Sequence, residues 1–360
     1  MSETADVGQG TVPGRRGRFP VPPCQQPDRE AGTVERAAGA LAGLALGDAI
    51  GMPGELWVPE RIRQTWGWLS GFHPAPRGHH IVDGFVAGQV TDDTQQAYML
   101  AATIRDAGGE VRAEDVAREL VAWADRVGAS DGKFLGPSSA RAIDLLRSGA
   151  DPRLTGAGGD TNGAAMRIAP IGVVRRPDDL EALVDAVVEA TVMSHDTGVA
   201  ISGACLVAGV VSAAVEGADL TDAIGVGMRA AALGRRRGEQ TVAASVTSRT
   251  ELALTLAARG TGDEEFLTEL YDLVGAWVTT TESVPAAVGL LARAEGDPVR
   301  ATELAANLGG DTDTIGAMAG AMAGAASGIA AIPADLLAVL REVNQIDPDG
   351  LAEQLVRFRR

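Results

Sequence analysis

Two short acidic motifs are the residues with the clearest chemical potential in this sequence. One directly precedes the apolar run 95–107, and the other follows a glycine turn and leads into a second apolar run. Their carboxyl and hydroxyl residues are Thr91, Asp92, Asp93, Asp311, Asp313 and Thr314. Taken singly, each motif is typical of a helix N-cap followed by an acid that the helix dipole favours.

Together the motifs supply four carboxylates and two hydroxyls, an oxygen-only ligand set that suits Mg²⁺, Ca²⁺ or Mn²⁺ rather than zinc. No lysine or arginine lies near the second motif, so the acids would repel one another without a cation. If the fold brings the motifs together, they can hold two octahedral ions that share a bridging carboxylate, as in two-metal hydrolases. The sequence therefore predicts one shared metal site.

A third segment, Gly158 to Arg167, combines glycines, an acid and an amide. Gly158 and Gly159 would let backbone amides approach a phosphate, but the segment lacks the lysine of a P-loop and follows no evident strand. By itself, this segment predicts a loop.

Two further acids lie within and just after the first apolar helical run, residues 33–50. Asp48 lies inside this run, where a hydrogen bond to a neighbouring backbone is its expected role. Glu55 follows the Pro53-Gly54 break, and its loop position fits a gate or a proton shuttle. The sequence leaves both roles open.

The histidines predict no zinc site. His73, His79 and His80 lie in a loop rich in Pro and Gly, and no partners stand at zinc-binding spacing. His195 lies at a helix start, where a capping-turn residue and a functional residue are equally good interpretations. With no Gly-x-Ser-x-Gly elbow and no plausible cysteine nucleophile, a metal-activated or carboxylate-assisted mechanism is the main enzymatic option.

The elements that must position these residues are predicted to be helices. Apolar residues recur with helical spacing, and no long run alternates with period two, so we expect one all-α domain of roughly a dozen helices over residues 33–360, after a disordered tail at 1–32. Glycines recur at every fourth position in 39–51 and again in 316–328. Since such a stripe lets another backbone approach closely, we expect both helices at the centre of the fold.

Composition excludes several partners. A net charge of −17 and only 4% aromatic residues argue against nucleic acid and anionic membranes. The uncharged stretches 199–215 and 315–332 are rich in Ala and Gly, so we interpret them as buried helices rather than membrane spans. Cys24 and Cys205 form no disulfide pattern, which favours a reducing, intracellular setting. With the acidic composition and no credible signal peptide, we expect a cytoplasmic monomer or small homo-oligomer.

The order of the motifs resembles that of the ADP-ribosylglycohydrolase family, which includes the enzyme that reactivates dinitrogenase reductase. The resemblance covers residues 33–343 and implies a compact all-α catalytic domain with two Mg²⁺ or Mn²⁺ ions that cleaves the ribosyl C1 linkage of an ADP-ribosylated protein or metabolite. It assigns as metal ligands Thr91, Asp92, Asp93, Asp311, Asp313 and Thr314. It assigns catalytic roles to Glu55, Asp92 and Asp311. It assigns substrate binding to Asp160, Asn162, Gly163, His195, Gly309 and Gly310.

Two segments depart from the best-known members of that family, namely Gly158 to Asn162 and Asp196 to Gly198. Both lie where the acceptor side of the substrate would bind. Hydrolysis of another nucleotide or nucleoside glycoside in a biosynthetic pathway therefore stays open, as does a non-catalytic descendant that binds ADP-ribose or resembles a lens crystallin.

Overall fold

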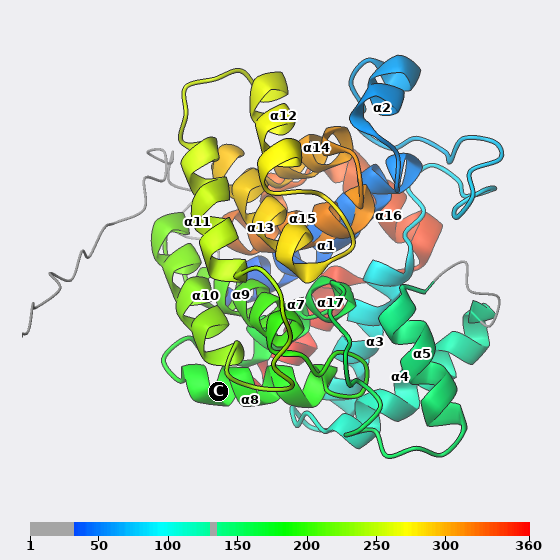
Figure 1. The fold of residues 1–360 in the computed structure, drawn as a ribbon, viewed down its shortest axis with the longest axis vertical. Helices are drawn as coiled ribbons and strands as arrows, with labels where there is room; N and C mark the ends of the chain where they lie inside the picture. Colours follow the sequence, from blue (N-terminus) through cyan, green and yellow to red (C-terminus); the bar gives the residue numbers. More distant parts are fainter. Residues whose placement is uncertain (1–31, 130–134) are drawn as a thin grey trace, which may run out of the picture.

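The computed structural model describes residues 32–129 and 135–360, and all regular elements in these ranges are helical (Figure 1). Only three isolated β-bridges occur there. The α-helices are α1 (Thr33–Gly51), α2 (Pro59–Trp66), α3 (Asp92–Asp106), α4 (Ala113–Val127), α5 (Pro137–Arg147), α6 (Gly163–Met166), α7 (Ala169–Val174), α8 (Leu180–Thr191), α9 (Gly198–Val215), α10 (Leu220–Gly234), α11 (Val246–Ala257), α12 (Asp263–Leu273), α13 (Thr280–Arg293), α14 (Pro298–Leu308), α15 (Thr312–Ser327), α16 (Ala334–Asn344) and α17 (Pro348–Val356).

The predicted all-α class is confirmed, but the expected dozen helices were too few. Helices α2, α12 and α17 were not predicted from the sequence, and neither were the short helices α6 and α7. The eight residues of α2 are mostly polar, and α6 and α7 have four and six residues, which is too short for a helical period to show. The predicted tail lies almost wholly in residues 1–31, outside the described ranges.

Helices α1 and α15 form the centre of the fold, and their glycine stripes face each other. A β-carbon on Gly39, Gly43 or Gly47 would overlap a backbone carbonyl oxygen of Gly324, Gly320 or Gly316, respectively. The two backbones therefore touch along most of both helices, in the blue and orange core of Figure 1. The predicted central position of both helices is confirmed, and the contact between them offsets the poor helix propensity of glycine.

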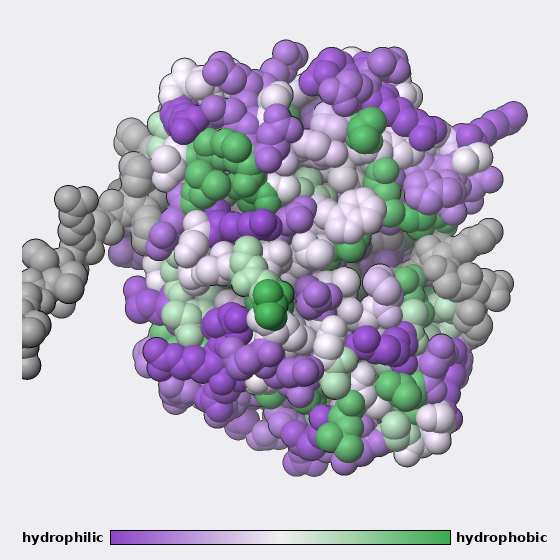
Figure 2. All heavy atoms as spheres, in the orientation of Figure 1, coloured by the Kyte–Doolittle hydropathy of each residue, from purple (hydrophilic) through white to green (hydrophobic). Residues whose placement is uncertain are grey.

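Helix α9 lies deep in the core. It is the one helix in the described ranges that is long and apolar enough to cross a membrane, yet all its residues are buried inside the protein. Hydrophilic side chains, in contrast, cover most of the molecular face drawn in Figure 2, with only scattered apolar patches. The interpretation of the apolar stretch 199–215 as a buried helix is confirmed.

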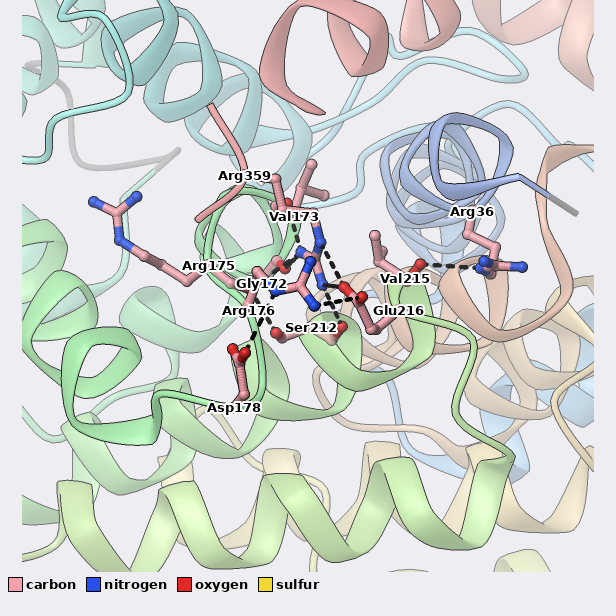
Figure 3. Close-up of polar contacts among 10 residues, drawn as sticks. All are labelled: Arg36, Gly172, Val173, Arg175, Arg176, Asp178, Ser212, Val215, Glu216 and Arg359. Atoms are coloured by element: carbon pink, nitrogen blue, oxygen red, sulfur yellow. Dashed lines mark hydrogen bonds and ion pairs between the residues drawn. The ribbon is translucent and has the colours of Figure 1, made fainter. Parts of the chain in front are cut away.

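The residues after α17 are held against the ends of two core helices (Figure 3). Arg359 donates from Nη1 to the carbonyl oxygens of Gly172 and Val173, and from Nη2 to the carbonyl oxygen of Ser212 and the carboxylate of Glu216. The last carbonyl groups of a helix have no partner within the helix. A single guanidinium thus caps both α7 and α9.

Candidate metal centre and active site

Three carboxylates from three different helices converge at the centre of the molecule. Asp48 of α1, Asp93 of α3 and Asp313 of α15 each offer one oxygen, and these oxygens lie within 4.8 Å of one another. The three residues are only 0%, 1% and 3% exposed, respectively. The backbone contact between α1 and α15 brings Asp48 and Asp313 together, and the N-terminus of α3 adds Asp93.

Asp48 also holds the first turn of α3. Its carboxylate accepts hydrogen bonds from the backbone N–H of Thr91 at 3.0 Å, from the backbone N–H of Thr94 at 3.0 Å and from Thr94 Oγ1 at 2.5 Å. The expected structural hydrogen bond is therefore confirmed. Its place in the acidic cluster was missed, and the signal for it was the presence of an acid within an otherwise apolar helix.

Asp93 provides the test of whether these residues fit a metal ion. Its Oδ2 accepts a hydrogen bond from Thr91 Oγ1 at 2.9 Å, whereas its buried Oδ1 has no protein partner. A buried carboxylate oxygen without a partner costs free energy unless a ligand satisfies it. Because two further carboxylates lie beside it, a hard divalent cation fits this position.

Burial and mutual repulsion make these carboxyls hard to ionise without a cation. Burial raises the pKa of Asp48 to about 6, and burial together with the charges of Asp48 and Asp311 raises the pKa of Asp92 to about 8. The pKa values of Asp93 and Asp313 also lie well above the usual range, for the same two reasons. A cation would remove the repulsion that produces part of these shifts.

A cavity of about 490 Å³ opens above the acidic cluster. All of the predicted metal ligands line it: Thr91, Asp92, Asp93, Asp311, Asp313 and Thr314. Glu55 lies on its wall as well, and burial together with the charges of Asp311, Asp92 and Asp48 holds the pKa of this glutamate well above its usual range. The two acidic motifs therefore line one cavity, and their joint binding of metal stays a prediction.

The predicted substrate residues divide into two groups. Asn162 and Gly163 line the cavity, and Asn162 Nδ2 donates a hydrogen bond to Asp311 Oδ2 at 2.5 Å. Asp160, in contrast, is exposed and lies outside the cavity lining. Its backbone carbonyl accepts a hydrogen bond from the backbone N–H of Thr280 at 3.2 Å, so it helps to anchor the loop.

The remaining three predicted substrate residues are buried and do not line the cavity either. The N–H of Gly310 donates to the carbonyl oxygen of Trp57, and its α-carbon packs so closely on Ala276 that a side chain would not fit. Gly309 packs against Pro59. His195 is 0% exposed and lies directly beneath Gly163, where a β-carbon would contact its ring.

Several residues of the cavity wall had no predicted role in the site, namely Thr161, Ser139, Met166, His80 and Trp277. Nothing in the spacing of these residues pointed to a site. Arg167 had no predicted role either, but it is a fully buried cation hydrogen-bonded to Gln96 and Ser194.

A column of rings supports the loop that carries Glu55. The ring of His79 stacks on Trp57 with a centroid distance of 5.5 Å, and His80 stacks on the other side of His79 at 4.9 Å. The Nδ1 atom of His79 accepts from the backbone N–H groups of residues 81 and 82, so its Nε2–H donates to the carbonyl oxygen of Glu55 at 3.1 Å. His79 therefore fixes the backbone of Glu55.

Comparison with known proteins gives relatives for this architecture. The chain is 38% identical over 326 residues to the "Uncharacterized protein YegU" of Escherichia coli (strain K12), which covers 91% of this chain and 98% of that protein. It is 31% identical over 150 residues to the "ADP-ribosyl-[dinitrogen reductase] glycohydrolase" of Rhodospirillum rubrum, which covers 41% of this chain and 48% of that enzyme.

The fold has a similar counterpart among solved structures. An "ADP-ribosylglycohydrolase-related protein complex" superposes with a TM-score of 0.67 at 23% identity, covering 91% of this chain and 99% of the other. The model of the ADP-ribosylglycohydrolase family matches residues 29–360. Because this match includes every helix and both acidic motifs, the chain belongs to the ADP-ribosylglycohydrolase family.

Proposed function

We propose that this protein is a metal-dependent glycohydrolase that cleaves the ribosyl C1 linkage of an ADP-ribosylated substrate. The observation that carries the proposal is the convergence of Asp48, Asp93 and Asp313 beneath a cavity that Glu55 also lines. Membership of the family supports the glycohydrolase class. A non-catalytic descendant would have no need to keep so many carboxylates buried together.

Two Mg²⁺ or Mn²⁺ ions fit the number and hardness of the ligands. Those that would hold them are Thr91, Asp92, Asp93, Asp311, Asp313 and Thr314, with Asp48 beside them. When bound, such ions supply Lewis-acid chemistry and lower the pKa of a water molecule.

The protein's own groups account for the rest of the proposed reaction. Burial, the largest cause, raises the pKa of Glu55 well above its usual range, so this carboxyl group keeps its proton to a higher pH than an exposed glutamate and can give it to the leaving group. Carboxylates around the ribose stabilise the positive charge that develops at C1 in an oxocarbenium-like transition state. Asn162 holds Asp311 in place through its hydrogen bond to Oδ2.

The proposed substrates are ADP-ribosyl groups on a protein side chain or on a small metabolite, through an N- or O-glycosidic bond. The relative from Rhodospirillum rubrum acts on an ADP-ribosylated protein, as its name states. We further propose that the protein works in the cytoplasm as a monomer or small homo-oligomer. Its net charge of −17 disfavours nucleic acid and anionic membranes as partners.

The test is release of ADP-ribose from ADP-ribosyl-arginine, ADP-ribosyl-serine and small ADP-ribosylated compounds, with Mg²⁺ and with EDTA. We expect turnover of at least one compound, its loss in EDTA, and a fall of at least about 100-fold in kcat for Asp311→Asn. The matched control is Asp335→Asn, which changes an exposed acid outside the cavity and should leave turnover intact. Binding of ADP-ribose without turnover of any compound, or the same rate in EDTA, would contradict the proposal.

A further inference from the structure

The buried guanidinium of Arg167 connects Asp92, which lines the cavity, to the buried side chain of Ser194. Arg167 is fully buried, and its Nη1 donates at 3.0 Å to Gln96 Oε1. The amide nitrogen of Gln96 in turn donates at 2.9 Å to Asp92 Oδ2 in the cavity wall. On its other side, Arg167 donates from Nη2 to Ser194 Oγ at 2.6 Å.

The chain of hydrogen bonds continues to a second residue of the cavity wall. Ser194 Oγ lies 2.8 Å from His195 Nδ1, and His195 Nε2 lies 3.0 Å from Thr161 Oγ1. All three residues are buried, and Thr161 lines the cavity. The ring of His195 reaches this position because Gly163 has no side chain above it.

The direction of each hydrogen bond follows from the arginine. A guanidinium can only donate, so Ser194 Oγ accepts from Arg167 and must place its own hydrogen elsewhere. His195 Nδ1 lies at 2.8 Å from this oxygen, whereas the alternative acceptor, the carbonyl oxygen of Thr191, lies at 3.5 Å. Ser194 therefore donates to Nδ1, and the proton of a neutral His195 is on Nε2.

Histidine 195 is held in its neutral form. Burial lowers its pKa well below the usual value, and the positive charges of Arg167 and Arg141 lower it further. A neutral ring with Nδ1 as the acceptor has only the Nε2–H to offer, and this group donates to Thr161 Oγ1. The hydrogen of the Thr161 hydroxyl is then free to point away from His195.

We propose that Thr161 is a ligand-binding residue that donates a hydrogen bond from its hydroxyl group to an oxygen of the bound substrate, and that Arg167, Ser194 and His195 are positioning residues that fix this direction. The backbone around Thr161 is anchored, since its carbonyl oxygen accepts from Thr280 Oγ1 at 2.8 Å. The inference rests on the proposed function only for the identity of the ligand. An ADP-ribosyl group presents hydroxyl, ring and phosphate oxygens that accept such a bond.

The first experiment needs no ligand. In protein labelled with ¹⁵N-histidine, long-range ¹H–¹⁵N spectra distinguish the two neutral tautomers, and the signal of His195 is assigned by its loss in His195→Asn. We expect the proton on Nε2 in the wild-type protein, and a change in this tautomer in Ser194→Ala if that variant folds. A proton on Nδ1 in the wild-type protein would overturn the inference, whether or not the variant folds.

The second experiment measures the affinity for ADP-ribose by calorimetry in the presence of Mg²⁺. Thr161→Val keeps the shape of the side chain but removes the donor, and we expect about tenfold weaker binding. Thr161→Ser should restore affinity to within about twofold of wild type, because it restores the hydroxyl. The matched control is Thr103→Val, whose hydroxyl donates to the carbonyl oxygen of Met99 outside the cavity and should not affect affinity.

The outcomes separate the inference from the proposed function. If the wild-type protein binds ADP-ribose and Thr161→Val binds it equally well, the inference fails and the proposed function stands. If the wild-type protein binds no ADP-ribose, the proposed function fails, and the tautomer of His195 still decides the direction of the hydrogen bonds.

Discussion

The carboxylate of Asp48 accepts a 2.5 Å hydrogen bond from the hydroxyl of Thr94, so a residue of α1 fixes the first turn of α3. The same carboxylate lies with Asp93 and Asp313 in the acidic cluster. One side chain thus joins the architecture of the fold to the proposed chemistry, and its replacement should affect both.

Asp48→Asn is expected to destabilise the protein even without metal. An amide offers one acceptor oxygen in place of two and places N–H donors against those of Thr91 and Thr94, so the free energy of unfolding should fall by about 1–3 kcal/mol. Urea denaturation in EDTA measures this loss, and a Mg²⁺ titration should show weaker binding. Asp335→Asn is the control, and equal stability of the two variants would contradict the role assigned to Asp48.

Gly47→Ala is expected to disrupt the central helix pair. The added methyl group would overlap the carbonyl oxygen of Gly316, and the cost of overpacking a rigid backbone contact is about 1–3 kcal/mol or more. Gly225→Ala in α10 is the matched control, because only the side chain of Arg229 approaches that position. There the better helix propensity of alanine should stabilise the protein by about 0.5–1 kcal/mol. Thermal unfolding should move in opposite directions for the two variants.

Stabilisation by metal is expected to grow with pH. The pKa values of about 6 for Asp48 and about 8 for Asp92 exceed the value of about 3.9 for aspartate in an unfolded chain. Between pH 4 and 8, roughly, the folded metal-free protein binds more protons than the unfolded chain, so its stability falls as pH rises. A cation favours the ionised carboxylates and offsets this loss.

The measurement is the difference in Tm between Mg²⁺ and EDTA. It should be larger at pH 8 than at pH 5 by at least about 3 °C. Asp313→Asn, which removes one carboxylate of the cluster, should reduce the difference at both pH values. A difference that does not change with pH in the wild-type protein would contradict the expectation.

His79→Ala is expected to lower turnover without weakening metal binding. The substitution removes the donor to the carbonyl oxygen of Glu55 and one ring of the column on Trp57, so the proton donor loses its fixed position. We expect a fall of about tenfold in kcat, with Mg²⁺ affinity within about twofold of wild type. His73→Ala changes a histidine of the same loop that does not contact Glu55, and it should retain full activity.

Much of the fold followed from patterns that act locally. The glycine stripes predicted close helix contact because four-residue spacing places all members of a stripe on one face, and α1 and α15 meet on those faces. The two acidic motifs predicted one metal site because their carboxylates, with no lysine or arginine near the second motif, need a cation to balance their charge. Both features depend on residue type and spacing alone.

Other parts of the site depend on contacts that spacing does not encode. His195 and Thr161 are 34 residues apart, and their hydrogen bond exists only because the loop over residues 156–163 packs on residues 192–195, between α8 and α9. Arg167 reads in the sequence as an ordinary charged residue, and only its burial makes it the fixed donor of the network. The family resemblance assigned Gly309 and Gly310 to substrate binding, but their α-carbons pack against Pro59 and Ala276.

The contact between α1 and α15 also determines how the chain can fold. The hydroxyl of Thr312 donates to the carbonyl oxygen of Gly51 across a separation of 261 residues. Contacts of such high order form late, because the entropy of closing a long loop must be overcome before they contribute. An N-terminal fragment that stops before α15 would lack both the partner of its central helix and the carboxylate of Asp313. Core and metal ligands are therefore expected to become ordered in one cooperative step.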